Sequence, residues 1–190
     1  MIQKLLLVFL FAVTASYGVA EQNIKKVMDT KTKQVIKILK NKSLTQKQKN
    51  KKSIKIMDPI FSYPTMAKIS LGKKWKTLTN KEKKAFSKAF EHKIKHSYID
   101  KLKLYKNQKV ITGNPKKIKP NRIKLTTKII GNNETYKIVN SFYKKRGSNQ
   151  WYIYDVNLAG VSIMQTYRKQ FKAFLKTKSF KQLLHSLKSQ

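Results

Sequence analysis

The 190-residue sequence predicts a single α+β domain, in which an antiparallel sheet of three or four strands packs with several helices. Two observations indicate this class. Before residue 105 and after residue 160, apolar residues recur at steps of three and four, the period of an amphipathic helix. Between about residues 109 and 158 they alternate with polar residues, as in a strand with one buried face. Because these strands follow one another directly, we expect an antiparallel meander.

Residues 1–20 have the pattern of a secretory signal peptide. A positively charged start precedes an apolar run at 5–13, and Gly18 and Ala20 are small residues suited to cleavage after Ala20. A membrane anchor is the alternative, but the run is shorter than the roughly 20 apolar residues that span a bilayer. We therefore expect export across the inner membrane and a mature domain over residues 21–190.

The net charge is formally +36, from 44 Lys and Arg against 8 Asp and Glu. Such a charge indicates an anionic partner: nucleic acid, a lipid headgroup surface or an acidic protein. Only Arg122, Arg146 and Arg168 are arginines, and base reading usually needs the arginine fork. An AT-rich gene is an alternative origin of the lysines, although it does not account for the scarcity of Glu. With no cysteine, the chain folds without disulfides.

The first half of the chain is predicted to be helical. An apolar stripe at 23–39 indicates one helix, and 43–45 is the start of another. Thr79, with Glu82 three residues later, begins a longer helix through a capping box. Its large side chains recur every four residues, at Phe86, Phe90, Ile94, Tyr98 and Leu102. Because a step of four drifts by about 40° around a 3.6-residue helix, we expect a bend or break near Ser97.

Three strands follow, with residues 109–112 as a possible fourth. Alternation at 123–129 and at 136–143 predicts two strands, joined by a Gly-Asn-Asn hairpin turn at 131–133. A second turn at 146–149 leads into a strand that starts at Trp151.

The segment from Trp151 to Phe171 changes from the period of a strand to that of a helix near Gly160. In the strand, simple alternation places Trp151, Ile153 and Asp155 on one face, and Tyr152, Tyr154, Val156 and Leu158 on the other. An amphipathic helix begins at Val161. Asp155 is a charge in an apolar strand, and an ion pair with Arg168 is its structural interpretation.

Catalytic and metal-binding signals are weak. His92 and His96 have the helical spacing of metal ligands, but Lys93 stands where a zinc protease has Glu, and both histidines lie opposite the apolar stripe. We expect them to be exposed and to bind no metal. The carboxylates are widely spread, so neither an enzyme nor a cofactor is expected. The aromatic residues share faces with Ile, Leu and Val, which disfavours base stacking and a nucleic-acid ligand.

Two blocks of sequence resemble the MlaC family (the toluene-tolerance auxiliary component family) of periplasmic phospholipid-binding proteins. The first is similar to the family's "LG..W...s......F...F" pattern, through the segment 69–75 (ISLGKKW), Thr79, Phe86 and Phe90. The second is similar to "W.vyDv...GvS...nYR.qF", through Trp151, Tyr154-Asp155-Val156, Gly160-Val161-Ser162, Tyr167-Arg168 and Phe171. Thr166 departs from the commoner Asn before Tyr-Arg.

The resemblance implies a soluble periplasmic carrier with phospholipid as its cargo and no cofactor. Such a carrier shuttles lipid between an outer-membrane lipoprotein complex and an inner-membrane ABC transporter complex, and so maintains outer-membrane lipid asymmetry. Exposing roughly 30 tail methylenes to water costs on the order of 24 kcal/mol, so the carrier needs an apolar cavity under a curved sheet. The lysines also favour transient contact with an anionic membrane surface.

Ten residues are predicted from their facing and family position to line this cavity: Phe90, Ile94, Tyr98, Tyr105, Tyr152, Tyr154, Val156, Val161, Met164 and Tyr167. Arg168 is the predicted headgroup contact, and Trp75, Trp151 and Phe171 are predicted core. Three other interpretations remain open. One is a secreted polycationic module that binds anionic polymers or lipopolysaccharide, and another is a periplasmic adaptor whose pocket is only core. The third is an enzyme with the same broad fold, which would require a polar cluster inside the cavity.

Overall fold

The computed structural model describes residues 18–103, 105–131 and 134–189. Most of the predicted signal peptide, residues 1–17, and the centre of the predicted Gly-Asn-Asn turn lie outside the described residues, so cleavage stays a prediction. Within the described ranges, the helices are all too short or too polar to cross a membrane.

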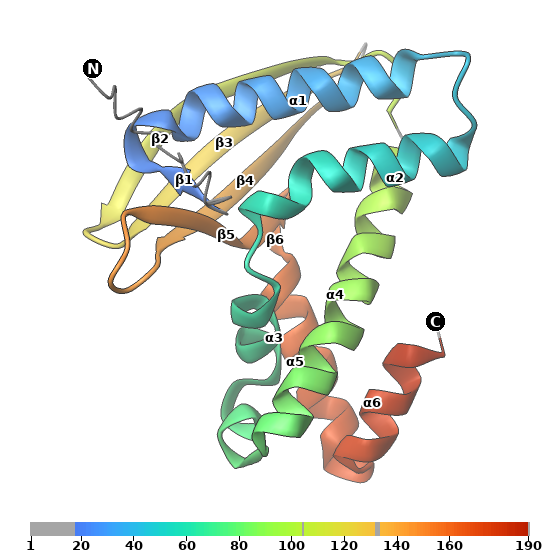
Figure 1. Ribbon diagram of the computed structural model, residues 1–190, viewed down its shortest axis with the longest axis vertical. Helices are drawn as coiled ribbons and strands as arrows, with labels where there is room; N and C mark the ends of the chain where they lie inside the picture. The colour runs from blue at the N-terminus through green and yellow to red at the C-terminus, as the bar shows by residue number, and fades with distance from the viewer. Residues whose placement is uncertain (1–17, 104, 132–133, 190) are drawn as a thin grey trace, which may run out of the picture.

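The described chain forms a sheet part and a helical part, which extends away from it (Figure 1). This arrangement confirms the predicted α+β class. Two helices belong to the sheet part: α1 (Ile24–Lys40) and α2 (Gln46–Met57). Four form the helical part: α3 (Tyr63–Leu71), α4 (Asn80–Leu102), α5 (Ile163–Thr177) and α6 (Phe180–Lys188). The short 3₁₀ turn η2 (Asp58–Ile60) joins α2 to the helical part.

The sheet is curled and antiparallel, in the order β1-β5-β4-β3-β2, and β6 adds to β5. Its long strands are β2 (Lys109–Lys119), β3 (Arg122–Ile130), β4 (Thr135–Lys144) and β5 (Gln150–Leu158). These are the four predicted strands. The prediction missed β1 (Val19–Ala20) and β6 (Val161–Ser162), since two residues show no period.

The strand β1 lies inside the predicted signal peptide. Val19 is only 3% exposed and pairs with Trp151 of β5. The backbone N–H of Gly18 donates a hydrogen bond to the carbonyl of Pro59 (3.0 Å). Gly18 has a φ of +105°, and a Cβ there would meet the Tyr152 ring at 2.6 Å, so glycine is required. Cleavage after Ala20 would therefore remove a strand from the sheet.

The prediction of a break near Ser97 is wrong, because α4 runs unbroken from its capping box at Thr79 to Leu102. The drifting apolar stripe of α4 instead packs against two cores. Phe86, Phe90 and Ile94 pack in the core of the helical part, whereas Tyr98 and Leu102 pack against the core under the sheet. The 40° drift thus turns the stripe from one core to the other along one continuous helix.

The predicted faces of β5 are wrong after Tyr154. The register runs Phe142↔Ile153 and then Ser141↔Asp155, so Tyr154 is an extra residue in a β-bulge. The bulge puts Val156 on the same face as Ile153. It also moves Asp155 to the opposite face.

Asp155 does not form the predicted ion pair with Arg168, which is absent from the ion pairs of the described chain. Its carboxylate instead accepts hydrogen bonds from the Ser162 hydroxyl (2.7 Å) and from the Met164 backbone N–H (3.1 Å). A carboxylate is stabilising beside the free N–H groups at the start of a helix. Asp155 therefore anchors the first turn of α5 to β5.

Candidate functional site

One face of the sheet, the inner face, is covered unevenly by α1, α2 and η2. At one end of the strands the side chains are 0–2% exposed: Ile123, Leu125, Phe142, Trp151 and Ile153. We call this group the sealed end. They pack with apolar side chains of α1, α2, η2 and β1. This end is complete protein core, and it confirms the expectation that Trp151 is core.

At the other end of the same face, the apolar side chains are only half-buried or exposed. Register and alternation continue the inner face to Val110, Ile129, Tyr136, Ile138 and Leu158, which we call the open end. Tyr136 is 45% exposed and the other four are half-buried. The open end is therefore an apolar wall that this chain leaves partly uncovered.

Side chains from three helices pack against the core under the sheet. Leu39 of α1, Ile56 of α2, and Tyr98 and Leu102 of α4 are partly buried against it, as is Val156 of β5. Burial raises the pKa of Tyr98, so its hydroxyl stays neutral. Of these residues, Val156 is also the neighbour of Leu158 on the inner face of β5, so it connects the core to the open end.

Three polar side chains lie within or next to these apolar surroundings. Thr127 and Asn140 are buried on the inner face, where Thr127 pairs with Ile138 and Asn140 with Val156. The Ser53 hydroxyl of α2 is fully buried and has no hydrogen-bond partner within the described residues. A buried hydroxyl without a hydrogen-bond partner lowers the stability of the folded state.

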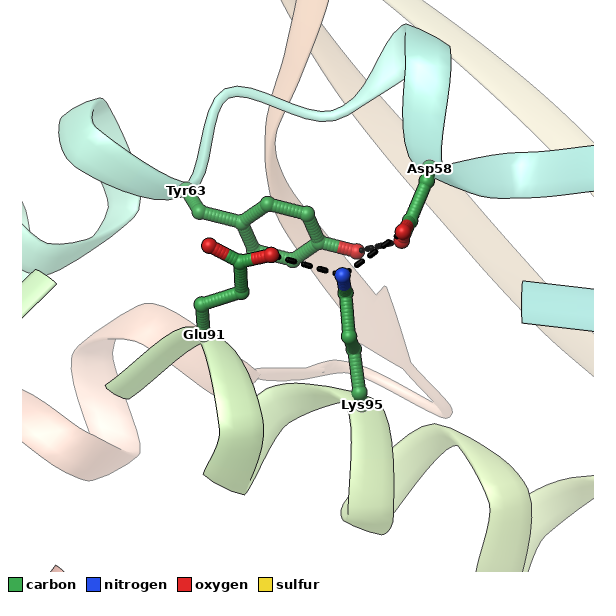
Figure 2. Close-up of polar contacts among 4 residues, drawn as sticks. All are labelled: Asp58, Tyr63, Glu91 and Lys95. Atoms are coloured by element: carbon green, nitrogen blue, oxygen red, sulfur yellow. Dashed lines mark hydrogen bonds and ion pairs between the residues drawn. The ribbon is translucent and has the colours of Figure 1, made fainter. Parts of the chain in front are cut away.

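A polar cluster joins the sheet part to the helical part (Figure 2). Lys95 of α4 forms ion pairs with Asp58 of η2 and Glu91 of α4, both at 2.6 Å, and the Tyr63 hydroxyl donates to Asp58 (2.7 Å). Burial lowers the pKa of Lys95, but its hydrogen bonds to Asp58 and Glu91 outweigh that effect and raise the pKa overall. Burial, and then the bond to Asp58, raise the pKa of Tyr63. The cluster thus fixes α4 against the turn between α2 and α3.

Four predicted lining residues lie in the core of the helical part. Phe90, Ile94 and Met164 are buried, and Tyr167 packs against them, with its ring 5.0 Å from the Phe90 ring. The Tyr167 hydroxyl is also hydrogen-bonded to Ser97 (3.1 Å). Phe171 is in the same core, as predicted, and Trp75 packs against it.

The other predicted lining residues are spread over three places. Val156 borders the open end, Tyr98 packs against the core under the sheet, and Tyr105 is half-buried just after α4. Tyr152 and Tyr154 lie on the outer face of the sheet beside Tyr143, at ring distances of 6.1 and 6.0 Å.

Val161 is 60% exposed and pairs with Leu158 at the open end. The structure therefore brings Val156 and Val161 to the border of the open end, and does not gather all ten residues around one site. Their contact with a ligand stays a prediction.

The predicted headgroup residue Arg168 is exposed on α5 and lies over Gly72, at the end of α3. A Cβ on Gly72 would be 3.1 Å from the Arg168 Nε, and the φ of Gly72 is +57°. Arg168 is therefore on the helical part and does not belong to the sheet. Its role as a headgroup contact stays a prediction.

His92 and His96 are exposed, as expected, with their Nε2 atoms 3.1 Å apart. Among the described residues no group of three or more His, Asp or Glu is placed to hold a metal ion. Two surface hollows of about 550 and 590 Å³ lie on the C-terminal half of α1 and between α5 and α6. Both are rich in lysine, and neither contains a predicted lining residue.

None of the five residues of the open end was predicted as lining: Val110, Ile129, Tyr136, Ile138 and Leu158. Their alternation was visible in the sequence, but alternation gives only a face and not what covers it. Alternation also placed Leu158 on the wrong side of β5, because a one-residue bulge leaves no signal in the apolar pattern.

Comparisons with known proteins agree with this architecture. Among solved structures, a phospholipid-binding protein from Ralstonia solanacearum, in complex with a phospholipid, is similar with a TM-score of 0.72 and 19% identity. The similarity covers 87% of this chain and 94% of that one, and it shows a shared fold. No curated protein matches the sequence significantly. The family model described as MlaC protein matches residues 29–189, and the chain therefore belongs to the MlaC family.

Proposed function

We propose that this protein is a periplasmic phospholipid carrier and that the open end of the inner face receives the acyl chains. Family membership and the phospholipid bound to the Ralstonia protein support a binding role, as opposed to an enzymatic one. The observation that carries the proposal is the partly uncovered apolar wall beside a fully sealed core. Apolar surface of this kind, continuous with a core, marks a ligand or interaction site.

The physical requirement is a large apolar contact. Shielding two acyl chains from water is worth on the order of 24 kcal/mol, far more than a few scattered side chains provide. The half-buried residues of the open end supply apolar side chains from four strands of the sheet, and Val156 continues them toward the core. Cargo completes the burial that the protein alone leaves unfinished.

Buried polar side chains of the inner face fit the polar part of a phospholipid. Thr127 pairs with Ile138 of the open end, and Asn140 lies one pair nearer to the sealed end on the same face. Both can donate hydrogen bonds to ester groups of the cargo.

The carrier exchanges lipid with an outer-membrane lipoprotein complex and an inner-membrane ABC transporter complex. The support for this is the family to which the chain belongs, together with the predicted signal peptide. A carrier working between two membranes must release its cargo at both. An apolar wall that is open along one side allows this, because the lipid leaves without unfolding the sealed core.

Native mass spectrometry of the protein purified from a periplasmic extract tests the proposal. We expect an added mass of one phospholipid, released on unfolding. Ile138→Asp should abolish this added mass, because it puts a charge on the open end. The matched control is Val139→Asp, on the same strand and also half-buried but pointing to the outer face, which should keep the lipid.

Equal loss of lipid in both variants would contradict the proposed site. A protein purified without lipid that instead binds anionic polymers would contradict the carrier and support the polycationic module.

A further inference from the structure

We propose that the end of the sheet next to the open end docks directly on an anionic bilayer surface. The inference rests on the proposed function, because the docking places the lipid-binding wall against the membrane. It is carried by a separate observation: where the exposed apolar side chains and the lysines of the sheet lie relative to each other.

Exposed large apolar side chains gather at one end of the sheet. Within the described residues there are four: Ile111 (41% exposed), Tyr136 (45%), Val161 (60%) and Ile118 (45%). The first three lie on β2, β4 and β6 within two registers of one another, whereas Ile118 is at the opposite end, beside the β2–β3 turn. Ile111 is on the outer face, and Tyr136 and Val161 are on the inner face, so exposed apolar side chains flank this end of the sheet on both sides. Exposed apolar side chains that gather at one place mark an interaction surface.

Lysines alternate with these apolar side chains along the same end. Ile111, Lys128 and Lys137 pair across three neighbouring strands and form one row on the outer face. Lys109 lies two residue pairs further out on the same face. All three lysines are exposed, and Glu134, also exposed, is the acidic residue of the β3–β4 hairpin. The docking surface thus consists of Ile111, Tyr136, Val161, Lys109, Lys128 and Lys137, with a net positive charge.

This composition fits a bilayer interface. Tyrosine prefers the headgroup level of a membrane, where its ring is in an apolar environment and its hydroxyl is wet. Lysines near an anionic leaflet are attracted to it and keep their stems on apolar surface. Docking in this orientation brings Ile129 and Ile138 close to the lipid, so acyl chains pass to the wall with little exposure to water.

Binding to lipid vesicles, measured by flotation of the lipid-loaded protein, tests the inference. The variant combines Ile111→Ser, Lys128→Ser and Lys137→Ser, which all lie on the outer face and outside the proposed cargo wall. The matched control combines Ile118→Ser, Lys116→Ser and Lys124→Ser at the opposite end, where Lys116 and Lys124 also pair on the outer face. The variant and the control therefore each lose one isoleucine and two positive charges.

We expect wild type and control to bind vesicles that contain phosphatidylglycerol, and the variant to bind about tenfold more weakly or worse. Vesicles of phosphatidylcholine alone should bind all three proteins poorly. Native mass spectrometry of the same samples should show lipid in all three, so a docking defect is distinguishable from loss of the carrier function.

Two results would overturn the inference. Equal weakening of the variant and the control would mean that overall charge, and not this end of the sheet, drives membrane binding. A wild-type protein that carries lipid yet binds no vesicles, and whose variant loses binding to a partner protein, would assign this surface to a protein contact.

Discussion

The two ends of the inner face use the same strands and the same alternation, yet one is core and the other is not. At the sealed end, Phe142 and Trp151 are fully buried under α1, η2 and β1. At the open end, Ile138 and Leu158, on the same two strands, are half-buried. This difference in burial comes from the covering segments and not from the strands. A tightly packed end, which stabilises the fold, and the proposed cargo-binding end are thus separated along the length of one sheet.

The largest expected effect is on stability at the sealed end. Phe142→Ala removes a fully buried ring that pairs with Ile153, so it should lower the free energy of unfolding by about 3–5 kcal/mol. Urea denaturation of the delipidated protein measures this loss. A loss below about 1 kcal/mol would mean that this end is not tightly packed, and the contrast between the two ends would fail.

The second effect concerns β1, which helps to close the sealed end. A chain that begins at Glu21 lacks the buried Val19 and the hydrogen bond from Gly18 to Pro59. It should be about 2–3 kcal/mol less stable than a chain that begins at Gly18, from one buried apolar side chain and lost backbone bonds. Thermal unfolding compares the two chains.

The intact mass of the exported protein then shows which of them the cell makes. Processing after Ala20 with no loss of stability would mean that β1 is dispensable. Processing before Gly18 would correct the cleavage position expected from the sequence.

Particular elements show how much of the fold can be predicted from the sequence alone. The capping box of Thr79, the alternation in β3 and the core position of Trp151 follow from local patterns and were predicted correctly. The bulge at Tyr154 and the pairing of Val19 depend on contacts distant in the chain, and no local period reveals them.

The candidate site was therefore predicted only in part. Val156 and Val161 lie at its border, but the residues that form its wall become visible only with strand register. Phe90 and Met164 carry the same apolar spacing as a cavity wall, yet their neighbours on α5 and α6 complete a core around them. Spacing identifies a buried face but not whether protein or ligand covers it.

The third expected effect is at the junction of the two parts. Lys95→Met leaves Asp58 and Glu91 without their cation and should cost about 1–3 kcal/mol at neutral pH, with both carboxylates partly exposed. Because folding raises the pKa of Lys95 above 10.5, its contribution is fully present below pH 10.5 and is lost as the pH rises through the higher folded value.

Chemical denaturation of wild type and variant between pH 7 and 11 measures this difference. The gap between the two proteins should stay constant up to about pH 10 and then narrow. A gap that widens at alkaline pH would show that Lys95 is not held as a cation by this cluster.

The smallest effect on stability, and the most informative one, is expected at the open end. Ile138→Ala removes a side chain that the described segments leave half-buried, so the free energy of unfolding of the delipidated protein should fall by at most about 1 kcal/mol.

A ligand that binds only the folded state adds its own stabilisation, and a weakened wall reduces that addition. Wild type should therefore gain more from added phospholipid than Ile138→Ala does, in melting curves with and without lipid. Phe142→Ala, at the sealed end, should show the opposite pattern, with a large loss when empty and a nearly normal gain from lipid. Equal gains for Ile138→Ala and wild type would place the cargo elsewhere and leave the open end without a function in lipid binding.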